Sequence, residues 1–135
     1  MFNVPKKIFI IEDDANILSG LQAKFSLIGY LVKTHSGNEK IEIIVSEIKK
    51  EMPDFIILDL ILPRVDGFEL LKLLKKSDEI AGATIFVFTN LSDQDSRGKG
   101  LNLGAKYYFL KEELSLDGLV EKVERIIQNR EKIII

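Results

Sequence analysis

The stretch PDFIILDLILPRVDG, residues 53–67, is the most informative part of the chain for the fold. It holds a short apolar run, 55–58, that ends in an acidic residue, Asp59. Continuous rather than alternating apolar residues are typical of strands that are covered on both faces. The chain then passes a proline and an Asp-Gly pair, and Phe68, Leu71 and Leu74 follow at helical spacing. We therefore predict a buried strand, a turn and a helix.

The same strand-and-helix unit occurs five times along the chain. Apolar runs predict strands at 8–11, 31–34, 55–58, 85–88 and 107–110, and helices follow each of them. Asp14 is well placed to cap the first helix and Ser115 to start the last. The helix within 92–103 has the weakest pattern, because Gly98 and Gly100 lower its propensity. The repetition predicts one α/β domain, a doubly wound parallel sheet with helices on both faces.

The composition of the chain argues against several classes of function. The chain has 135 residues, 46% of them hydrophobic, with a formal net charge of −2 and no cysteine. One domain with a sizeable core is expected, without disulfides or thiol chemistry. The charge gives no reason to expect direct nucleic-acid binding, and no apolar run is long enough for a membrane span or a signal peptide. We expect a soluble, cytoplasmic protein.

Polar residues follow the predicted strands at their carboxyl ends. Glu12 and Asp13 follow the first strand, Asp59 the third, Thr89 the fourth and Lys111 the fifth. In such sheets ligands bind at this edge, beside a switch in strand order. Converging carboxylates repel one another unless a cation is present, and Mg²⁺ prefers oxygen ligands of this kind. One carboxylate could attack phosphorus, while Lys111 and Thr89 stabilise the charge that develops.

Each residue taken singly has a structural explanation as well. An acidic cluster after a strand is often a solvated loop with a helix cap, and a lone Thr or Lys at a strand end is usually structural. Asp59 is harder to explain in this way, because an unpaired carboxylate beside an apolar strand is costly. The joint placement at four strand ends favours a functional site. His35, the only histidine, has no evident partner and is expected to be a surface residue.

Four segments together resemble the receiver domain of bacterial response regulators, in particular the chemotaxis-type single-domain receiver. They are IFIIEDD (8–14), PDFIILDLILPRVDG (53–67), FVFT (86–89) and GAKYYFLK (104–111), of which the second is the most specific. The resemblance implies a flavodoxin-like sheet of five parallel strands in the order 2-1-3-4-5, with five helices. It assigns residues 1–130 to the receiver domain and 131–135 to a C-terminal tail, with no output domain in this chain.

The resemblance also implies roles for residues of the predicted pocket. By position, Asp59 is similar to the phospho-acceptor and Asp13 to the direct Mg²⁺ ligand. Glu12 would act through metal-bound water, and the backbone carbonyl of Ile61 matches a main-chain ligand of the metal.

Three further positions match the residues that sense the phosphoryl group. Thr89 resembles the switch hydroxyl, Lys111 the lysine that contacts the phosphoryl group, and Tyr108 the aromatic switch. From its pattern alone, Tyr108 is a strand residue with its ring in the core.

The implied function is a phosphorelay step in two-component signalling. A sensor histidine kinase or phosphotransfer protein would supply the phosphoryl group, and the receiver would catalyse only this transfer and its own slow dephosphorylation. The fourth helix, fifth strand and fifth helix would then meet an unknown downstream protein target. The resemblance also implies a monomer or a phosphorylation-dependent homodimer.

The chain departs from the family pattern at several places. Glu112 replaces the usual proline after the lysine, which predicts a differently shaped loop there. Asn90 replaces a small residue after Thr89, Leu62 replaces a common Met, and the segment 37–53 is about one helical turn longer than usual. Asn90 and Glu112 keep a second hypothesis open, a degenerate receiver that acts as a phosphorylation-independent protein-interaction module.

True enzymes on similar sheets fit the sequence less well. A phosphatase of the haloacid-dehalogenase type needs a second Asp two residues after the nucleophile, where this chain has Ile61. A nucleotide-binding protein would need a Gly-rich phosphate loop after the first strand. The ending III, residues 133–135, could be a truncated linker, a packing tail, a dimer contact or a frayed helix end.

Overall fold

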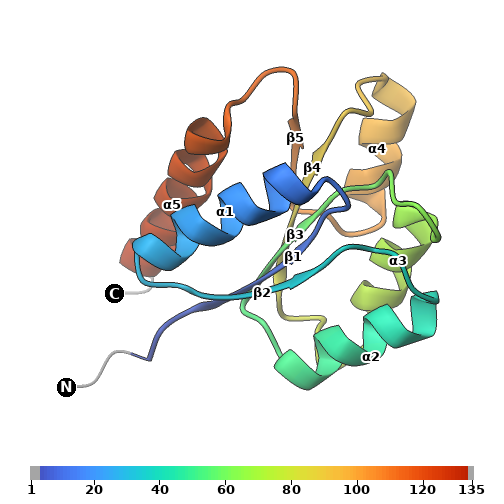
Figure 1. Ribbon diagram of the computed structural model, residues 1–135, viewed down its shortest axis with the longest axis horizontal. Helices are drawn as coiled ribbons and strands as arrows, with labels where there is room; N and C mark the ends of the chain where they lie inside the picture. The colour runs from blue at the N-terminus through green and yellow to red at the C-terminus, as the bar shows by residue number, and fades with distance from the viewer. Residues whose placement is uncertain (1–3, 134–135) are drawn as a thin grey trace.

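The computed structural model describes residues 4–133, with side chains to 130. Five strands alternate with five helices (Figure 1). In chain order they are β1 (Lys7–Ile11), α1 (Ala15–Leu27), β2 (Leu31–His35), α2 (Ile41–Glu51), β3 (Phe55–Leu58), α3 (Gly67–Lys76), β4 (Thr84–Thr89), α4 (Gln94–Asn102), β5 (Tyr107–Leu110) and α5 (Leu116–Ile133). All five predicted strands are confirmed to within one residue at each end. The polar segment with two glycines also forms its helix, α4.

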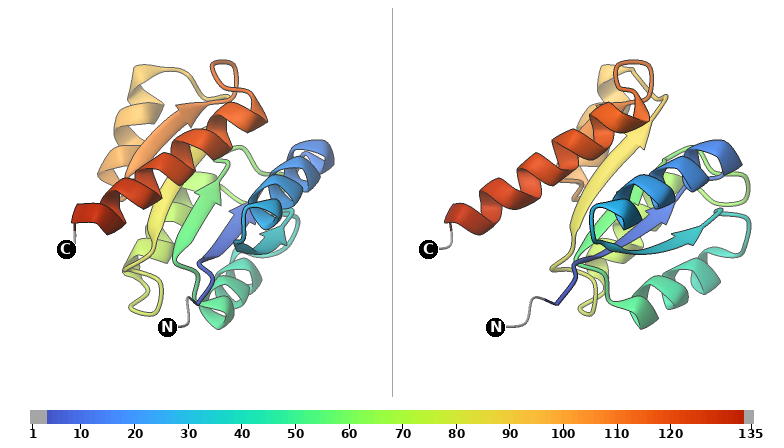
Figure 2. Two further views of the ribbon diagram at one scale, coloured as in Figure 1. Left: turned by 90° about the vertical axis from the view of Figure 1, so that its left-hand side faces the viewer. Right: turned by 60° about the vertical axis from the view of Figure 1, so that its left-hand side comes forward.

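The strands form one parallel sheet in the order β2-β1-β3-β4-β5. This confirms the predicted doubly wound, flavodoxin-like topology. Helices α1 and α5 cover one face, and α2, α3 and α4 cover the other (Figures 1 and 2). The chain reverses its direction of winding between β1 and β3, so the carboxyl ends of these two strands open onto a shared crevice.

Alternate residues of each strand enter two separate hydrophobic clusters. Phe9 and Ile11 pack beneath α2 and α3, whereas Ile8 and Ile10 pack beneath α1 and α5. Strands β1, β3 and β4 are buried on both faces, which explains their continuous apolar sequences. The rigid sheet fixes the positions of the residues that follow each strand.

Local capping follows the sequence closely. The Asp14 carboxylate accepts hydrogen bonds from two backbone N–H groups at the start of α1, as predicted. The Ser115 hydroxyl accepts one from the N–H of Gly118 at the start of α5. Helix α5 continues through Ile133, into the segment expected as a tail, and residues 134–135 lie outside the described part of the chain.

Candidate functional site

Three carboxylates meet where β1 and β3 end side by side. Ile11 is in register with Leu58, so the residues that follow them, Glu12 and Asp59, lie next to each other. Both are buried, at 2% and 4% exposure, whereas Asp13 is exposed. One carboxylate oxygen from each of the three lies within 4.8 Å of the others. The structure thus brings together the acidic residues that the sequence singled out.

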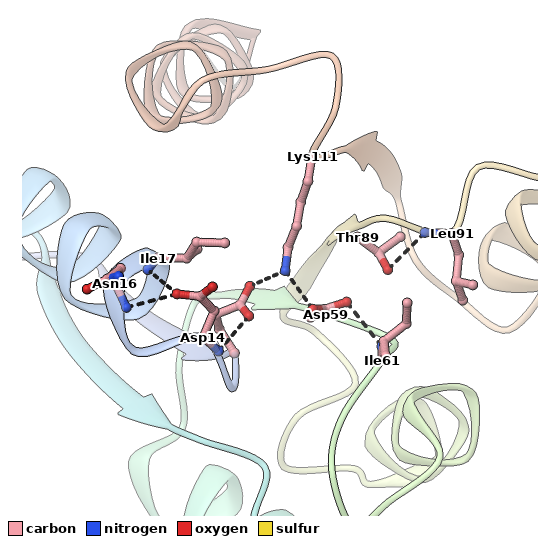
Figure 3. Close-up of polar contacts among 9 residues, drawn as sticks. Asp14, Asn16, Ile17, Asp59, Ile61, Thr89, Leu91 and Lys111 are labelled. Carbon is pink, nitrogen blue, oxygen red and sulfur yellow. Dashed lines mark hydrogen bonds and ion pairs between the residues drawn. The ribbon is translucent and has the colours of Figure 1, made fainter.

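Lys111 reaches into this acidic pocket from the end of β5 (Figure 3). Its Nζ lies 2.7 Å from Asp59 Oδ2 and 2.8 Å from Glu12 Oε1. Burial opposes the charge of the ammonium, but the hydrogen bonds to Asp59 and Glu12 outweigh it and raise the pKa of Lys111. Burial also raises the pKa of Glu12, in spite of its bond to Lys111. The ammonium is therefore a built-in counter-ion for two buried carboxylates.

The second oxygen of each buried carboxylate accepts a hydrogen bond from the backbone. The N–H of Asp14 donates to Glu12 Oε2 at 3.0 Å, and the N–H of Ile61 donates to Asp59 Oδ1 at 3.1 Å. Both groups are thereby held in fixed orientations. The Ile61 bond depends on a tight loop between β3 and α3, which Gly67 allows.

Gly67 is needed because α3 starts against the backbone of Leu60. A Cβ at Gly67 would lie only 2.4 Å from the carbonyl oxygen of Leu60. The N–H of Gly67 donates to that oxygen, and Asp66 caps the helix through the N–H of Phe68. The Asp-Gly pair of the sequence therefore shapes the loop that carries Ile61.

The donor set of the pocket fits a hard divalent cation. Three carboxylates face one ammonium, so the formal charge of these groups is about −2 when all are ionised. Oxygen ligands and an exposed carboxylate at the mouth, Asp13, suit Mg²⁺, which keeps several of its water molecules.

Thr89 and Tyr108 are linked through the backbone of one residue, Leu91. The N–H of Leu91 points at Thr89 Oγ1, 3.4 Å away, which is a long hydrogen bond. Its carbonyl oxygen accepts a hydrogen bond of 2.8 Å from the Tyr108 hydroxyl. Thr89 is fully buried at the end of β4. Sequence reasoning missed Leu91, because its hydrogen bonds with Thr89 and Tyr108 are both made by main-chain atoms.

The Tyr108 ring is held between β5 and α4. It is 4% exposed and lies against Gly100, where an added Cβ would come within 3.1 Å of two ring carbons. The guanidinium of Arg97 lies 5.7 Å from the ring centroid. Burial and the charge of Asp93 raise the pKa of the Tyr108 phenol, which keeps the hydroxyl protonated as the donor to Leu91.

The departures at Glu112 and Asn90 leave the pocket intact. The N–H of Glu113 donates to the carbonyl of Leu110 and closes a turn around Lys111 and Glu112. Among residues 4–133 every peptide bond is trans. Lys111 nevertheless reaches both carboxylates, and Asn90 is exposed.

The expectation for His35 was wrong. It is 8% exposed, and its Nε2 lies 2.7 Å from Glu39 Oε1 and 3.6 Å from Glu47 Oε2. The sequence offered a signal in HSGNE, residues 35–39, where a glycine and a glutamate follow the histidine at positions that a turn can bring back to its ring.

Comparison with known proteins assigns the chain to a family. The family model described as the response regulator receiver domain matches residues 8–124. A relative from Porphyridium aerugineum, named as a probable transcriptional regulator, ycf27, is 36% identical over 107 residues. A relative of the same name from Guillardia theta is 35% identical over 106 residues. Each alignment covers 78% of this chain but only 42% and 39% of the relative, so the chain spans about two fifths of their length.

Solved structures agree with this assignment. A CheY-like receiver domain protein from Methanospirillum hungatei superposes with a TM-score of 0.82 at 26% identity, covering 96% of this chain and 98% of that one. The response regulator DrrB of Thermotoga maritima, described as an OmpR/PhoB homologue, gives 0.78 at 28% identity, covering 94% and 54%. Among the described residues, no helix is both long and apolar enough to cross a membrane. The chain belongs to the response regulator receiver domain family of two-component signalling.

Proposed function

We propose that this receiver accepts a phosphoryl group on Asp59 from a sensor histidine kinase or phosphotransfer protein, in a Mg²⁺-dependent step. The observation that carries the proposal is the convergence of Glu12, Asp13, Asp59 and Lys111 at adjoining strand ends in a chain of this family. It gives a nucleophile, a cation and a place for a metal within one small pocket.

Asp59 is oriented for attack on phosphorus. The N–H of Ile61 fixes Oδ1, and Oδ2 faces the ammonium of Lys111. A carboxylate oxygen forms the new O–P bond as the P–N bond to the donor histidine breaks, and the leaving imidazole takes up the electron pair. The protein holds the acceptor in place, and the donor stores the energy, so this is signalling chemistry rather than turnover of a metabolite.

Mg²⁺, when bound, would neutralise charge on the transferring group. We propose Asp13, Asp59 and the carbonyl of Ile61 as its direct ligands, with Glu12 acting through water. Lys111 would then turn from its carboxylate partners toward a phosphoryl oxygen, which its long side chain allows.

The switch would start at Thr89. If its hydroxyl donates to a phosphoryl oxygen, Thr89 Oγ1 leaves the N–H of Leu91. Because the Leu91 carbonyl also holds Tyr108, that movement would reach the face built from α4, β5 and α5. A downstream protein would read this face, and phosphorylation could also favour a homodimer.

The relatives' names point to a class of output. They are named as probable transcriptional regulators and extend beyond the region that this chain matches. We propose that phosphorylation of this chain, in the cytoplasm, controls transcription through protein contacts rather than through direct binding of nucleic acid.

The test is an intact-mass spectrum after incubation with a small-molecule phosphodonor and Mg²⁺, beside the variant Asp59→Asn. We expect one added phosphoryl group that requires Mg²⁺ and is absent from the variant. If no adduct forms, and beryllofluoride with Mg²⁺ leaves the NMR signals of Thr89 and Lys111 unchanged, the acceptor role is wrong. The chain would then be a receiver that acts by protein contact alone.

A further inference from the structure

The ring of His35 is buried beneath the turn that follows β2. His35 ends β2, and its side chain is only 6% exposed. Its Nδ1 accepts a buried hydrogen bond of 2.8 Å from the N–H of Gly37, and its Nε2 lies 2.7 Å from Glu39 Oε1. These two bonds close the turn of residues 35–39, which precedes α2.

The bond from Gly37 determines where the ring carries its proton. A neutral imidazole has one N–H, and because Nδ1 accepts, the proton must be on Nε2, where it is donated to Glu39. Oxygens of Glu39 and Glu47 lie within 4.8 Å of Nε2, as in a metal site. The protonated Nε2 has no lone pair for a metal, so this group is a hydrogen-bonded cluster.

The turn contacts both segments that carry the acidic pocket, the end of β1 and the loop after β3. The carbonyl of His35 accepts a hydrogen bond of 3.1 Å from the N–H of Glu12. Gly37, with a φ of +79°, packs against Leu62, and a Cβ there would lie 2.8 Å from Leu62 Cδ2. Leu62 follows Ile61, whose N–H holds Asp59. The turn therefore supports both the β1 end and the loop after β3.

We propose that His35 is a positioning residue for the Mg²⁺ site, an inference that rests on the proposed function. Its ring fixes the turn 35–39, the turn supports Leu62, and Leu62 holds the loop that presents the carbonyl of Ile61. Loss of the ring would let this loop spread over several conformations, of which only some direct the carbonyl into the pocket. The affinity for Mg²⁺ would fall, while the chemistry of Asp59 at saturating Mg²⁺ would stay the same.

The experiment measures the Kd of Mg²⁺ by NMR titration of the backbone amides of Asp59 and Ile61, without any phosphodonor. We expect His35→Ala to raise the Kd about fivefold, less than the roughly 10–100-fold cost of losing a group that hydrogen-bonds a metal ligand directly, because His35 acts through Leu62. His35→Asn should restore the Kd to within about twofold, because its side-chain oxygen can accept the Gly37 N–H in an Asx-turn. The rate of phosphoryl uptake at saturating Mg²⁺ should change less than about twofold in both variants.

Two controls separate positioning from general destabilisation. Ile80→Ala removes a buried side chain of the same sheet face without touching the turn or the pocket, and should leave the Kd unchanged. Leu62→Ala should also raise the Kd of Mg²⁺. Its effect should not add to that of His35→Ala, because His35 acts on the loop after β3 through Leu62.

The outcomes are distinct. A Kd in His35→Ala equal to that of the unchanged protein, or no recovery in His35→Asn, overturns the inference and leaves the proposed function standing. Zn²⁺ binding that His35→Ala abolishes would overturn it in favour of a metal site. If the unchanged protein binds no Mg²⁺, the inference and the proposed function fall together, whereas Mg²⁺ binding without phosphoryl uptake contradicts only the latter.

Discussion

Two glycines of α4 offer a matched pair of substitutions that tests how closely the Tyr108 ring packs against this helix. Gly98 and Gly100 lie two residues apart in the same short helix. A Cβ added at Gly98 meets no atom within 4 Å, whereas one at Gly100 meets two ring carbons of Tyr108 at 3.0 and 3.1 Å. The intrinsic gain in helix propensity is the same at both positions, so the difference isolates the ring contact.

The magnitudes follow from these distances. Gly98→Ala should raise the free energy of unfolding by about 1 kcal/mol, the difference in helix propensity between glycine and alanine. Gly100→Ala has the same gain, but the buried Tyr108 ring must move, and overpacking of this kind costs about 1–3 kcal/mol. Movement of the ring also strains its bond to the Leu91 carbonyl. We expect Gly100→Ala to be less stable than Gly98→Ala by about 1–3 kcal/mol.

Urea denaturation followed by circular dichroism measures both values. In a Tyr108→Ala background the ring is gone, and the two substitutions should then stabilise the domain to a similar extent. If Gly100→Ala stabilises the protein with Tyr108 as much as Gly98→Ala does, the Tyr108 ring does not pack against Gly100, and the predicted cost of this contact is wrong.

Three further perturbations test separate features. Met52→Gly should raise the free energy of unfolding by about 0.5–1 kcal/mol in a urea titration, because Met52 has a φ of +47° after α2; a loss would show that its side chain has an unrecognised contact. Mg²⁺ at about 100 times its Kd should stabilise the domain by about 2.7 kcal/mol, and Asp13→Asn should lose most of this gain in thermal melts. In metal-free buffer Glu12→Gln should have a higher free energy of unfolding than the wild-type protein, and the difference should grow as pH rises from 4.5 through the raised folded-state pKa of Glu12. The reason is that the buried carboxyl group favours its protonated form, so the wild-type protein loses stability as this group ionises. A difference that shrinks with rising pH would contradict this assignment.

The sequence predicted the sheet well because its three central strands, β1, β3 and β4, are buried on both faces. Phe55 to Leu58 has no polar residue to disturb the pattern, and the same holds for most of β1 and β4. The acidic pocket was predictable for a related reason: parallel strands end at one edge, so residues such as Asp59 and Lys111 converge without any knowledge of side-chain contacts.

Contacts that depend on loop geometry were beyond the sequence. His35 lies at the last position of β2, one residue past the predicted strand, and its burial depends on how the turn 35–39 folds back over the ring. The close packing of the Tyr108 ring depends on the missing side chain of Gly100, a residue that the sequence indicated only as unfavourable in a helix. Neither contact has a periodic pattern, because each forms between a strand and a segment whose path is set by tertiary packing.

The link between Thr89 and Tyr108 has a consequence for sequence drift. Because Leu91 makes both hydrogen bonds with main-chain atoms, its side chain can vary among residues that still pack against the core without breaking either bond. Proline is the exception, since it lacks the N–H that faces Thr89. A connection of this kind depends on the path of the backbone, so descendants of this protein can exchange Leu91 for other apolar residues that fill the same space and still keep the link between the two hydroxyls.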